Sequence, residues 1–529
     1  MSDQRVKLDY DLLIIGGGIN GTGIARDAAG RGLKVALAEM NDLGEGTSSA
    51  STKLFHGGLR YLEYFNFKLV RHALKERETL LQAMPHISWP MRFILPLNTE
   101  MRFENTTPAS RLINFIFPWM KGRRPAWMIR FGLFLYDHLG GRKFLAGTTS
   151  LILNDSPEGA PLQEKYKKAY EYSDCWVDDS RLVVINARDA KIRGADIFVR
   201  TKVTAATQTK SHWKVTLQNL RENTTQVFST KMLINAAGPW VSNVLADTLL
   251  KHSGTQIRLV RGSHLVIKKL YDHQKSYVFQ GNDGRIIFAI PYETDFTLIG
   301  TTDVEHENSN LIPECSTEEQ DYLISFANSY FKKAITKADI VWTYSGVRPL
   351  YDDGASSATS ASRDYVLKID TIEGAPILNV YGGKITTYRC LAEDVLKAIA
   401  PFFPNMPNHW TAGVALPGGD FGINDVPCQI TNLLSVYSFL SQRWATRLIK
   451  AYGTDAFNIL ANAISKDDLG QDFGATLTEK EVRWLMGYEF ARSAEDILWR
   501  RSKLGLWMTE NQVQNLEDFI SQKQKEFSI

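Results

Sequence analysis

The sequence has 529 residues, of which 44% are hydrophobic and 22% are charged, and its formal net charge is +3. A chain of this length exceeds one ordinary hydrophobic core, so we expect two or three domains. The near-neutral charge argues against a nucleic-acid partner, which would require a larger, clustered basic surface.

No membrane-spanning or secretory segment is predicted. The N-terminus lacks a charged head followed by an apolar signal core, and no apolar run approaches the roughly 20 residues that span a bilayer. We therefore expect a protein that does not cross a membrane, although it can lie on one. The scattered cysteines form no C-x-x-C pair and no zinc pattern, which disfavours a disulfide framework and fits a reducing compartment. These are Cys175, Cys315, Cys390 and Cys428.

Residues 10–39 predict a βαβ unit that binds a dinucleotide. Apolar residues 10–15 and residues 34–39 are typical of parallel strands, and a helix rich in small residues lies between them. The turn G-x-G-x-x-G joins the first strand to this helix, where amides and the helix dipole favour phosphate. Glu39 ends the second strand, where its carboxylate can accept hydrogen bonds from ribose hydroxyls. The expected contacts at the turn are Gly16, Gly17, Gly18, Asn20 and Gly21.

Three later segments indicate FAD rather than NAD. The segment GTSSASTK at residues 46–53 follows the βαβ unit with small and hydroxylated side chains. MLINAAGPW at 232–240 and GGKITTY at 382–388 each place glycine after a predicted strand, and the second can face the flavin's pyrimidine end. The expected additional FAD-binding residues are Thr47, Ser48, Ser49, Ser51, Thr52, Lys53, Val203, Ala237, Gly238, Trp240, Gly382, Gly383, Lys384, Ile385 and Thr386.

The rest of the chain predicts two further units. Residues 66–83 have a helical pattern, and residues 196–350 alternate β-rich runs with turn signals, which is typical of an antiparallel substrate sheet. Separate strands are predicted at 256–260 and 264–267. Prolines and a Gly-Gly turn after residue 400 mark a boundary, and the remainder looks helical, with capping boxes predicted at Thr478 and Thr509.

The chain resembles the FAD-dependent, quinone-linked sn-glycerol-3-phosphate dehydrogenases. The matching segments run from near residue 14 to near residue 507, and several lie outside any nucleotide-binding pattern. They include IIGGGINGTGIARDAAGRGLKVALAE, TSSASTKLFHGGLRYLE, YEYSDCWVDDSRLV, INAAGPWV, IGTTDVE, WTYSGVRPL, SRDY, GGKITTYR and DILWRRSKLGLW.

The resemblance implies a particular fold. We expect an α/β protein with a Rossmann-like FAD-binding domain of the glutathione-reductase and D-amino-acid-oxidase type, an antiparallel substrate domain and a C-terminal all-helical domain. FAD-binding and substrate parts would interleave within residues 1–400. The FAD part would occupy mainly 8–90, 180–245 and 345–400, the substrate part mainly 90–180 and 245–345, and the helical domain 401–529.

The implied reaction is hydride transfer from C2 of glycerol 3-phosphate to flavin N5, giving dihydroxyacetone phosphate, with electrons passing to ubiquinone or menaquinone. Arginine forks suit a phosphate, and the resemblance places Arg60, Arg348 and Arg363 around the substrate, with Tyr61. His56 is the leading base because imidazole titrates near neutral pH. Further candidates are Lys384, which can bind substrate or stabilise reduced flavin, and Thr301, Thr302 and Asp303, which can position a hydroxyl.

Two features remain open to a plainer interpretation. Asp174, Asp178 and Asp179 suggest metal ligands, but flavin hydride chemistry needs no metal, so we expect a solvated turn and no metal. Residues 98–124 have no counterpart in the family's pattern, and their aromatic and basic side chains fit either a helix lying in a membrane interface or a loop packed on the protein or at a dimer contact.

The resemblance also suggests a homodimer bound peripherally to the cytoplasmic face of the inner membrane, with no nucleic-acid partner. An oxidase that makes peroxide would share nearly every motif and is distinguished by oxygen consumption without quinone. A flavin-binding redox sensor would not need the arginines, and nicotinamide-linked dehydrogenation fits the additional flavin segments poorly.

Overall fold

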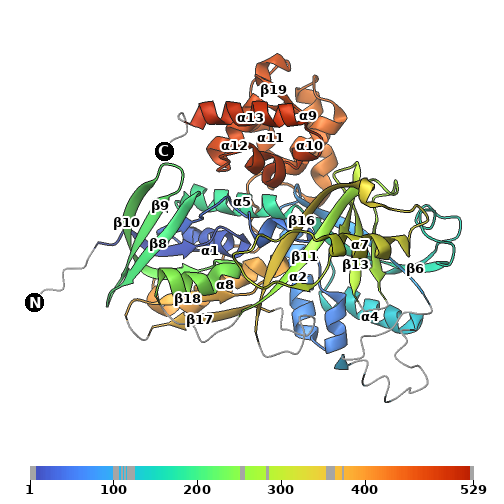
Figure 1. Ribbon diagram of the computed structural model, residues 1–529, viewed down its shortest axis with the longest axis horizontal. Coiled ribbons are helices and arrows are strands. Elements are labelled where there is room, and N and C mark those ends of the chain that lie inside the picture. The colour runs from blue at the N-terminus through green and yellow to red at the C-terminus, as the bar shows by residue number, and fades with distance from the viewer. Residues whose placement is uncertain are drawn as a thin grey trace, which may run out of the picture.

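The computed structural model describes residues 7–98, 107–108, 111, 115, 125–250, 257–281, 285–352, 364–371 and 374–524. Arg363 and nearly all of the 98–124 segment lie outside the described residues, so the predictions made for them stay predictions. The described chain forms two large sheets with helices packed on them, and a group of C-terminal helices lies over both (Figure 1).

The first sheet has eight strands and a parallel centre. Its main path runs β17–β18–β10–β1–β2–β7, and β8 and β9 extend it as an antiparallel meander next to β10. β1, β2, β7, β10 and β18 pair in parallel, which requires that both faces be covered. The bounds are β1 Tyr10–Ile15, β2 Val35–Ala38, β7 Asp196–Phe198, β8 Thr201–Gln208, β9 Trp213–Asn219, β10 Thr224–Asn235, β17 Val366–Asp370 and β18 Ile377–Tyr381.

Three helices cover one face of this sheet. They are α1 (Ile19–Gly30), α5 (Asp179–Ile192) and α8 (Tyr388–Ile399), and their apolar side chains share one buried core with β1. Alternate residues of β1, such as Leu13, point to a second core on the opposite face, beneath β8 and β9. The predicted βαβ unit is confirmed.

The second sheet has ten strands and is mostly antiparallel, except that β12 pairs with β4 in parallel. α2 (Phe67–Ala83) and α4 (Ala126–Leu139) pack with one of its apolar clusters, and α7 (Thr317–Asn328) packs with another. The bounds are β3 Leu54–Phe55, β4 Ser88–Pro96, β5 Thr149–Ile152, β6 Lys168–Val177, β11 Ile257–Lys268, β12 Ser276–Gln280, β13 Ile286–Tyr292, β14 Phe296–Gly300, β15 Val304–Glu305 and β16 Ile340–Tyr351.

The two strands predicted at 256–260 and 264–267 are one strand, β11. It pairs with β16 from Ile257 to Ile267, so backbone hydrogen bonds between the two strands continue through the polar residues 261–263. The polar side chains suggested that the strand ends there, but pairing of the backbone with β16 keeps these residues extended. This continuity matters because β11 pairs along its length with β16, and β16 lines the cavity described below.

The C-terminal helices have a core of their own. α9 (Val426–Val436), α10 (Gln442–Tyr452), α11 (Asp455–Leu460), α12 (Glu479–Tyr488) and α13 (Glu510–Lys523) bury one apolar cluster, beside a short ribbon of β19 (Asp472–Gly474) and β20 (Leu477–Thr478). The capping box at Thr509 is present, whereas the one predicted at Thr478 is wrong. Its intended partner Glu481 binds Arg447 and Tyr452 instead.

Buried arginines connect these helices to the first sheet. Asp42, in the loop after β2, accepts from Arg501 at 2.5 and 2.7 Å and from Arg500 Nε at 2.5 Å. All three residues are buried. We call this group the Asp42 clamp. It ties the loop between Glu39 and Thr47 to the end of the chain.

Candidate active site

A cavity of about 1390 Å³ lies between the two sheets. It is lined by the carboxyl ends of β1, β2, β10 and β18, and on the other side by β16 and the loop after β14. In α/β folds, ligands bind at this end of parallel strands. The volume exceeds that of an ordinary small-molecule pocket, roughly 300–1,000 Å³, as a dinucleotide plus a substrate requires.

The glycine turn after β1 has the shape of a phosphate cradle. Gly16 has φ +109°, and a β-carbon on Gly21 would lie 1.9 Å from Gly16 O, so only glycine lets α1 pack this closely on the turn. Gly16, Gly18 and Asn20 line the cavity, whereas Gly17 and Gly21 support the turn from behind. Asn20 donates to Gly382 O at 3.1 Å, while its buried Oδ1 has no partner among the described residues. An acceptor held in this way fits a bound ligand that donates a hydrogen bond.

Glu39 stands at the end of β2, where the ribose was expected. Its carboxylate accepts from Gly17 N at 2.6 Å and from Asn41 N at 2.8 Å. Burial raises the pKa of Glu39 to about 7, although these two amide bonds oppose the shift. The side chain lines the cavity and presents an acceptor to ribose hydroxyls. Val203 lies in the same cavity wall.

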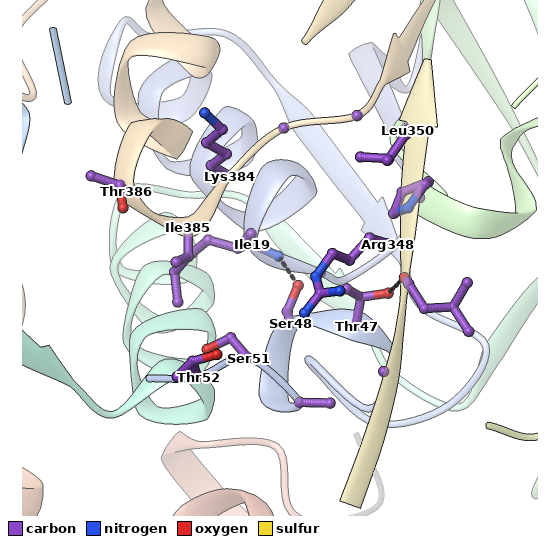
Figure 2. A pocket seen from close by; sticks show the side chains of 18 of the residues that line it. Ile19, Thr47, Ser48, Ser51, Thr52, Arg348, Leu350, Lys384, Ile385 and Thr386 are labelled. Carbon is purple, nitrogen blue, oxygen red and sulfur yellow. Dashed lines mark hydrogen bonds between the residues drawn. The ribbon is translucent and has the colours of Figure 1, made fainter. Parts of the chain in front are cut away.

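The hydroxylated segment at 46–53 bridges the two sheets. Ile19 N, at the start of α1, donates to Ser48 Oγ at 3.0 Å, and Thr47 Oγ1 donates to Val347 O of β16 at 2.5 Å (Figure 2). Thr47, Ser48, Ser51 and Thr52 line the cavity. The segment is therefore fixed against both the phosphate cradle and the substrate sheet.

Two members of this segment lie away from the cavity. Lys53 is fully buried and pairs with Asp179 at 2.6 Å, while Ser49 lines a separate small hollow beneath the C-terminal helices. Asp179 also accepts from Ser51 Oγ at 2.7 Å. The predicted direct FAD contacts of Lys53 and Ser49 are therefore corrected, because these side chains hold the segment from behind.

Residues after β10 and β18 complete the cofactor side. Ala237, Gly238 and Trp240 follow β10, and residues 382–386 follow β18, all lining the cavity. Lys384 Nζ lies 4.2 Å from the ring centroid of Tyr61, a cation–π contact that brings the flavin and substrate candidates together. Lys384, Ile385 and Thr386 surround the cavity together with Arg348 (Figure 2).

Most of the predicted substrate residues share this cavity. His56, Arg60, Tyr61, Thr301 and Arg348 all line it. The Arg348 guanidinium donates to Asp303 at 2.5 Å and to Thr301 Oγ1 at 3.2 Å, so its orientation is fixed by the loop after β14.

Thr302 is the exception. It is buried behind the cavity wall, and its hydroxyl donates to Glu319 Oε1 at 2.6 Å. The hydroxyl is thus occupied inside the protein, and the predicted substrate contact of Thr302 is corrected to a structural role.

The structure also brings in a residue that the sequence analysis missed. His264, in the middle of β11, is fully buried, and its Nε2 lies 3.0 Å from Thr52 Oγ1. Burial, with the charges of Arg348 and Lys53, lowers the pKa of His264 well below its usual range, so the ring is neutral. Its only sequence signal was a histidine inside an apolar strand.

The three aspartates after residue 173 do not form a solvated turn. Asp174 is buried, pairs with Arg77, and accepts from Tyr136 Oη at 2.8 Å; that hydroxyl in turn accepts from Gly57 N at 2.6 Å. Asp178 caps α5 by accepting from Arg181 N. The predicted solvated turn is wrong because each carboxylate has a buried structural partner.

The fold and site define a flavoprotein oxidoreductase in which a phosphate cradle and several cationic side chains line one cavity. Two family models match the chain: "FAD dependent oxidoreductase" over residues 11–389 and "C-terminal domain of alpha-glycerophosphate oxidase" over residues 409–528.

Curated relatives match almost the whole chain. It is 46% identical to the D-erythritol 1-phosphate dehydrogenase of Brucella abortus, covering 94% of this chain and 95% of the relative. It is 44% identical to the glycerol-3-phosphate dehydrogenase of Pseudomonas aeruginosa, covering 97% and 95%. It is 42% identical to the aerobic glycerol-3-phosphate dehydrogenase of Escherichia coli, covering 96% and 97%. A solved structure of the Bacillus halodurans glycerol-3-phosphate dehydrogenase with FAD superposes with a TM-score of 0.70 at 24% identity, covering 99% of this chain and 95% of that one.

The chain belongs to the family of FAD-dependent glycerol-3-phosphate dehydrogenases. The predicted fold class, family and cofactor are thereby confirmed. Among the described residues, every helix is too short or too polar to span a bilayer.

Proposed function

We propose that this protein oxidises sn-glycerol 3-phosphate to dihydroxyacetone phosphate. The observation that carries the proposal is one cavity in which the FAD cradle faces Arg60, Arg348 and Lys384. Three cationic side chains lining one cavity suit a phosphorylated substrate, which also accords with the names of the relatives. FAD, when bound, accepts the hydride from C2.

Each side chain has a role in this reaction. Arg60 and Arg348 bind the phosphate and hydroxyl oxygens, and Tyr61 supplies a further donor. The Asp303 carboxylate holds the Arg348 fork in place through their 2.5 Å contact. His56 takes the C2 hydroxyl proton as hydride leaves. Lys384, placed after the Gly382–Gly383 turn, favours negative charge on the reduced cofactor.

Anaerobic mixing tests the reaction directly. Glycerol 3-phosphate should bleach the flavin absorbance near 450 nm of the purified protein, and an Arg348→Ala variant should bleach far more slowly. A control mixture with glycerol should leave the absorbance unchanged, since it lacks the phosphate. A yellow protein that stays oxidised with glycerol 3-phosphate would refute the substrate assignment.

A second substrate, D-erythritol 1-phosphate, is favoured by the 46% identity to the Brucella abortus relative. This compound retains the phosphate and adds one CHOH unit, which the open cavity can accommodate. Measuring kcat/KM for both substrates in one preparation decides between them. A ratio above about ten for either corresponds to roughly 1.4 kcal/mol of discrimination in the transition state.

The electron acceptor is a membrane quinone in this proposal. Exposed aromatic side chains lie on the segment before α2, on α2 itself and on α4, where Phe131 is 57% and Trp127 60% exposed. Phe65, Phe67 and Phe131 also line the cavity. An exposed aromatic patch continuous with a flavin cavity suits docking on lipid and entry of an apolar acceptor. The family resemblance further suggests a homodimer bound peripherally to the cytoplasmic face of the inner membrane, and both belong to this proposal.

Reduction of a ubiquinone analogue, and flotation with phospholipid vesicles, test the acceptor and the membrane. A Trp127→Ser variant should lose flotation while keeping flavin bleaching by substrate, because Trp127 is exposed and does not line the cavity. Peroxide produced at the full turnover rate without quinone would instead identify an oxidase. Light scattering during gel filtration gives the oligomeric state.

A further inference from the structure

Glu319 joins the first turn of α7 to the wall of the active-site cavity. It is buried, and one carboxylate oxygen accepts from Thr302 Oγ1 at 2.6 Å and from Ser263 Oγ at 2.8 Å. The other accepts from Arg261 Nη2 at 2.8 Å and from Ser316 N at 3.1 Å. Four donors thus surround the carboxylate, which fills its usual hydrogen-bonding capacity.

Two of the donors to Glu319, Thr302 and Ser263, lie in the segments next to Arg348. Thr302 lies between Thr301 and Asp303, and both of those neighbours accept hydrogen bonds from the Arg348 guanidinium. Ser263 N also donates to Thr302 Oγ1 at 2.9 Å, which fixes this loop to β11. The loop that orients Arg348 is therefore anchored at its middle residue by the Glu319 carboxylate and by the backbone of β11.

A second connection runs to the strand that carries Arg348. Ser263 Oγ lies 2.7 Å from Ser345 Oγ on β16, three residues before Arg348. Ser345 lines the active-site cavity. Glu319 thus constrains Arg348 both through the loop that its fork contacts and through its own strand.

The bonding pattern requires an ionised carboxylate. Burial opposes ionisation, but the bonds from Thr302, Ser316 and Ser263 and the charge of Arg261 hold the pKa of Glu319 below its usual range. Glutamine has nearly the same shape but only one acceptor oxygen. If its NH2 group faced the two hydroxyls, these would have to accept instead of donate and would lose the carboxylate as their acceptor. If it faced the N–H groups of Arg261 and Ser316, donors would oppose donors.

We infer that Glu319 is a positioning residue for catalysis, which sets the orientation of Arg348 and Thr301 without touching the substrate. This inference rests on the proposed function in taking the Arg348 face as the substrate-binding face. It assigns to α7, which lies outside the cavity, a direct part in the geometry of the site.

The test compares Glu319→Gln with Ser316→Ala. Ser316 Oγ caps the same helix by accepting from Glu319 N, so Ser316→Ala reproduces the loss of the cap alone. For Glu319→Gln we expect kcat/KM for glycerol 3-phosphate to fall at least about 10-fold while FAD content stays normal. Ser316→Ala should stay within about 3-fold of wild type. An equal loss in both variants would overturn the inference, because it would trace the effect to helix stability.

A double-mutant cycle with Arg348→Lys measures the coupling between Glu319 and Arg348, which a general loss of stability does not change. If Glu319 acts through Arg348, then Glu319→Gln should lower kcat/KM by less than about 3-fold in the Arg348→Lys background. Full multiplication of the two fold-changes would contradict the inference.

A third measurement separates this inference from the proposed function. Amide hydrogen exchange of a peptide spanning residues 299–304 needs no substrate. Exchange there should be at least about 10-fold faster in Glu319→Gln than in Ser316→Ala. Unchanged exchange would refute the anchoring role, even in a protein that oxidises glycerol 3-phosphate. A wild type that fails to oxidise it, with the exchange difference present, would refute only the substrate assignment.

Discussion

Replacing Arg501 with methionine should destabilise the folded protein by about 3 kcal/mol and weaken FAD binding. The Arg501 and Asp42 side chains are 0% and 1% exposed and share bonds of 2.5 and 2.7 Å. Removing one partner of a buried ion pair usually costs about 3–5 kcal/mol, because the remaining charge is left uncompensated. Arg500 still binds Asp42 at 2.5 Å, so we expect the low end of that range.

The assay is urea unfolding of holoprotein and apoprotein, together with the fluorescence of FAD released on dilution. FAD affinity should fall because Asp42 fixes the loop that runs from Glu39 to Thr47. A matched Asp42→Asn/Arg501→Met double variant removes the unpaired charge and should recover part of the stability. The reasoning is refuted if Arg501→Met changes the unfolding free energy by less than about 1 kcal/mol, or if the double variant is less stable than the single one.

Three further predictions concern the cavity. FAD affinity of the apoprotein should fall as the pH drops from 8 to 6, because burial raises the pKa of Glu39 to about 7 and its carboxylate is protonated below that pH. Fluorescence titration with FAD at each pH checks this. In the Glu39→Gln variant, the plot of FAD affinity against pH should show no inflection. Gly21→Ala should purify largely without FAD, because its β-carbon would lie 1.9 Å from Gly16 O, and a normal ratio of absorbance at 450 and 280 nm would contradict this. Arg348→Lys should lower kcat/KM about 10- to 100-fold, because the variant loses one or two charge-assisted hydrogen bonds to the substrate. Steady-state rates above half of the wild-type rate would count against this prediction.

The sequence predicted the βαβ unit well because local rules govern it. Gly16, Gly18 and Glu39 follow from the spacing of one βαβ unit, whose turn, helix and strands are neighbours along the chain. The βαβ unit, the antiparallel sheet and the helical C-terminal part could therefore be predicted from periodicity and turn residues.

The direction in which individual side chains point was harder to predict. Lys53 and Thr302 lie in motifs whose neighbours line the cavity, yet both point into the protein, toward Asp179 and Glu319. These partners lie 126 and 17 residues away, and the position of a partner carboxylate is set by tertiary packing. His264 was missed for the same reason, because its partner Thr52 lies far away in the chain and reaches β11 only in the folded protein.

The Asp42 clamp also determines when, during synthesis of the chain, the loop after β2 can reach its final structure. Asp42 and its two arginines are 458 and 459 positions apart in the chain. At about 5–20 residues per second, a ribosome needs roughly 25–90 seconds to synthesise the stretch between them. During that time the nascent βαβ unit carries a carboxylate whose partners do not yet exist. We therefore expect FAD to be loaded after release of the full chain, and messages cut short before residue 500 to yield apoprotein.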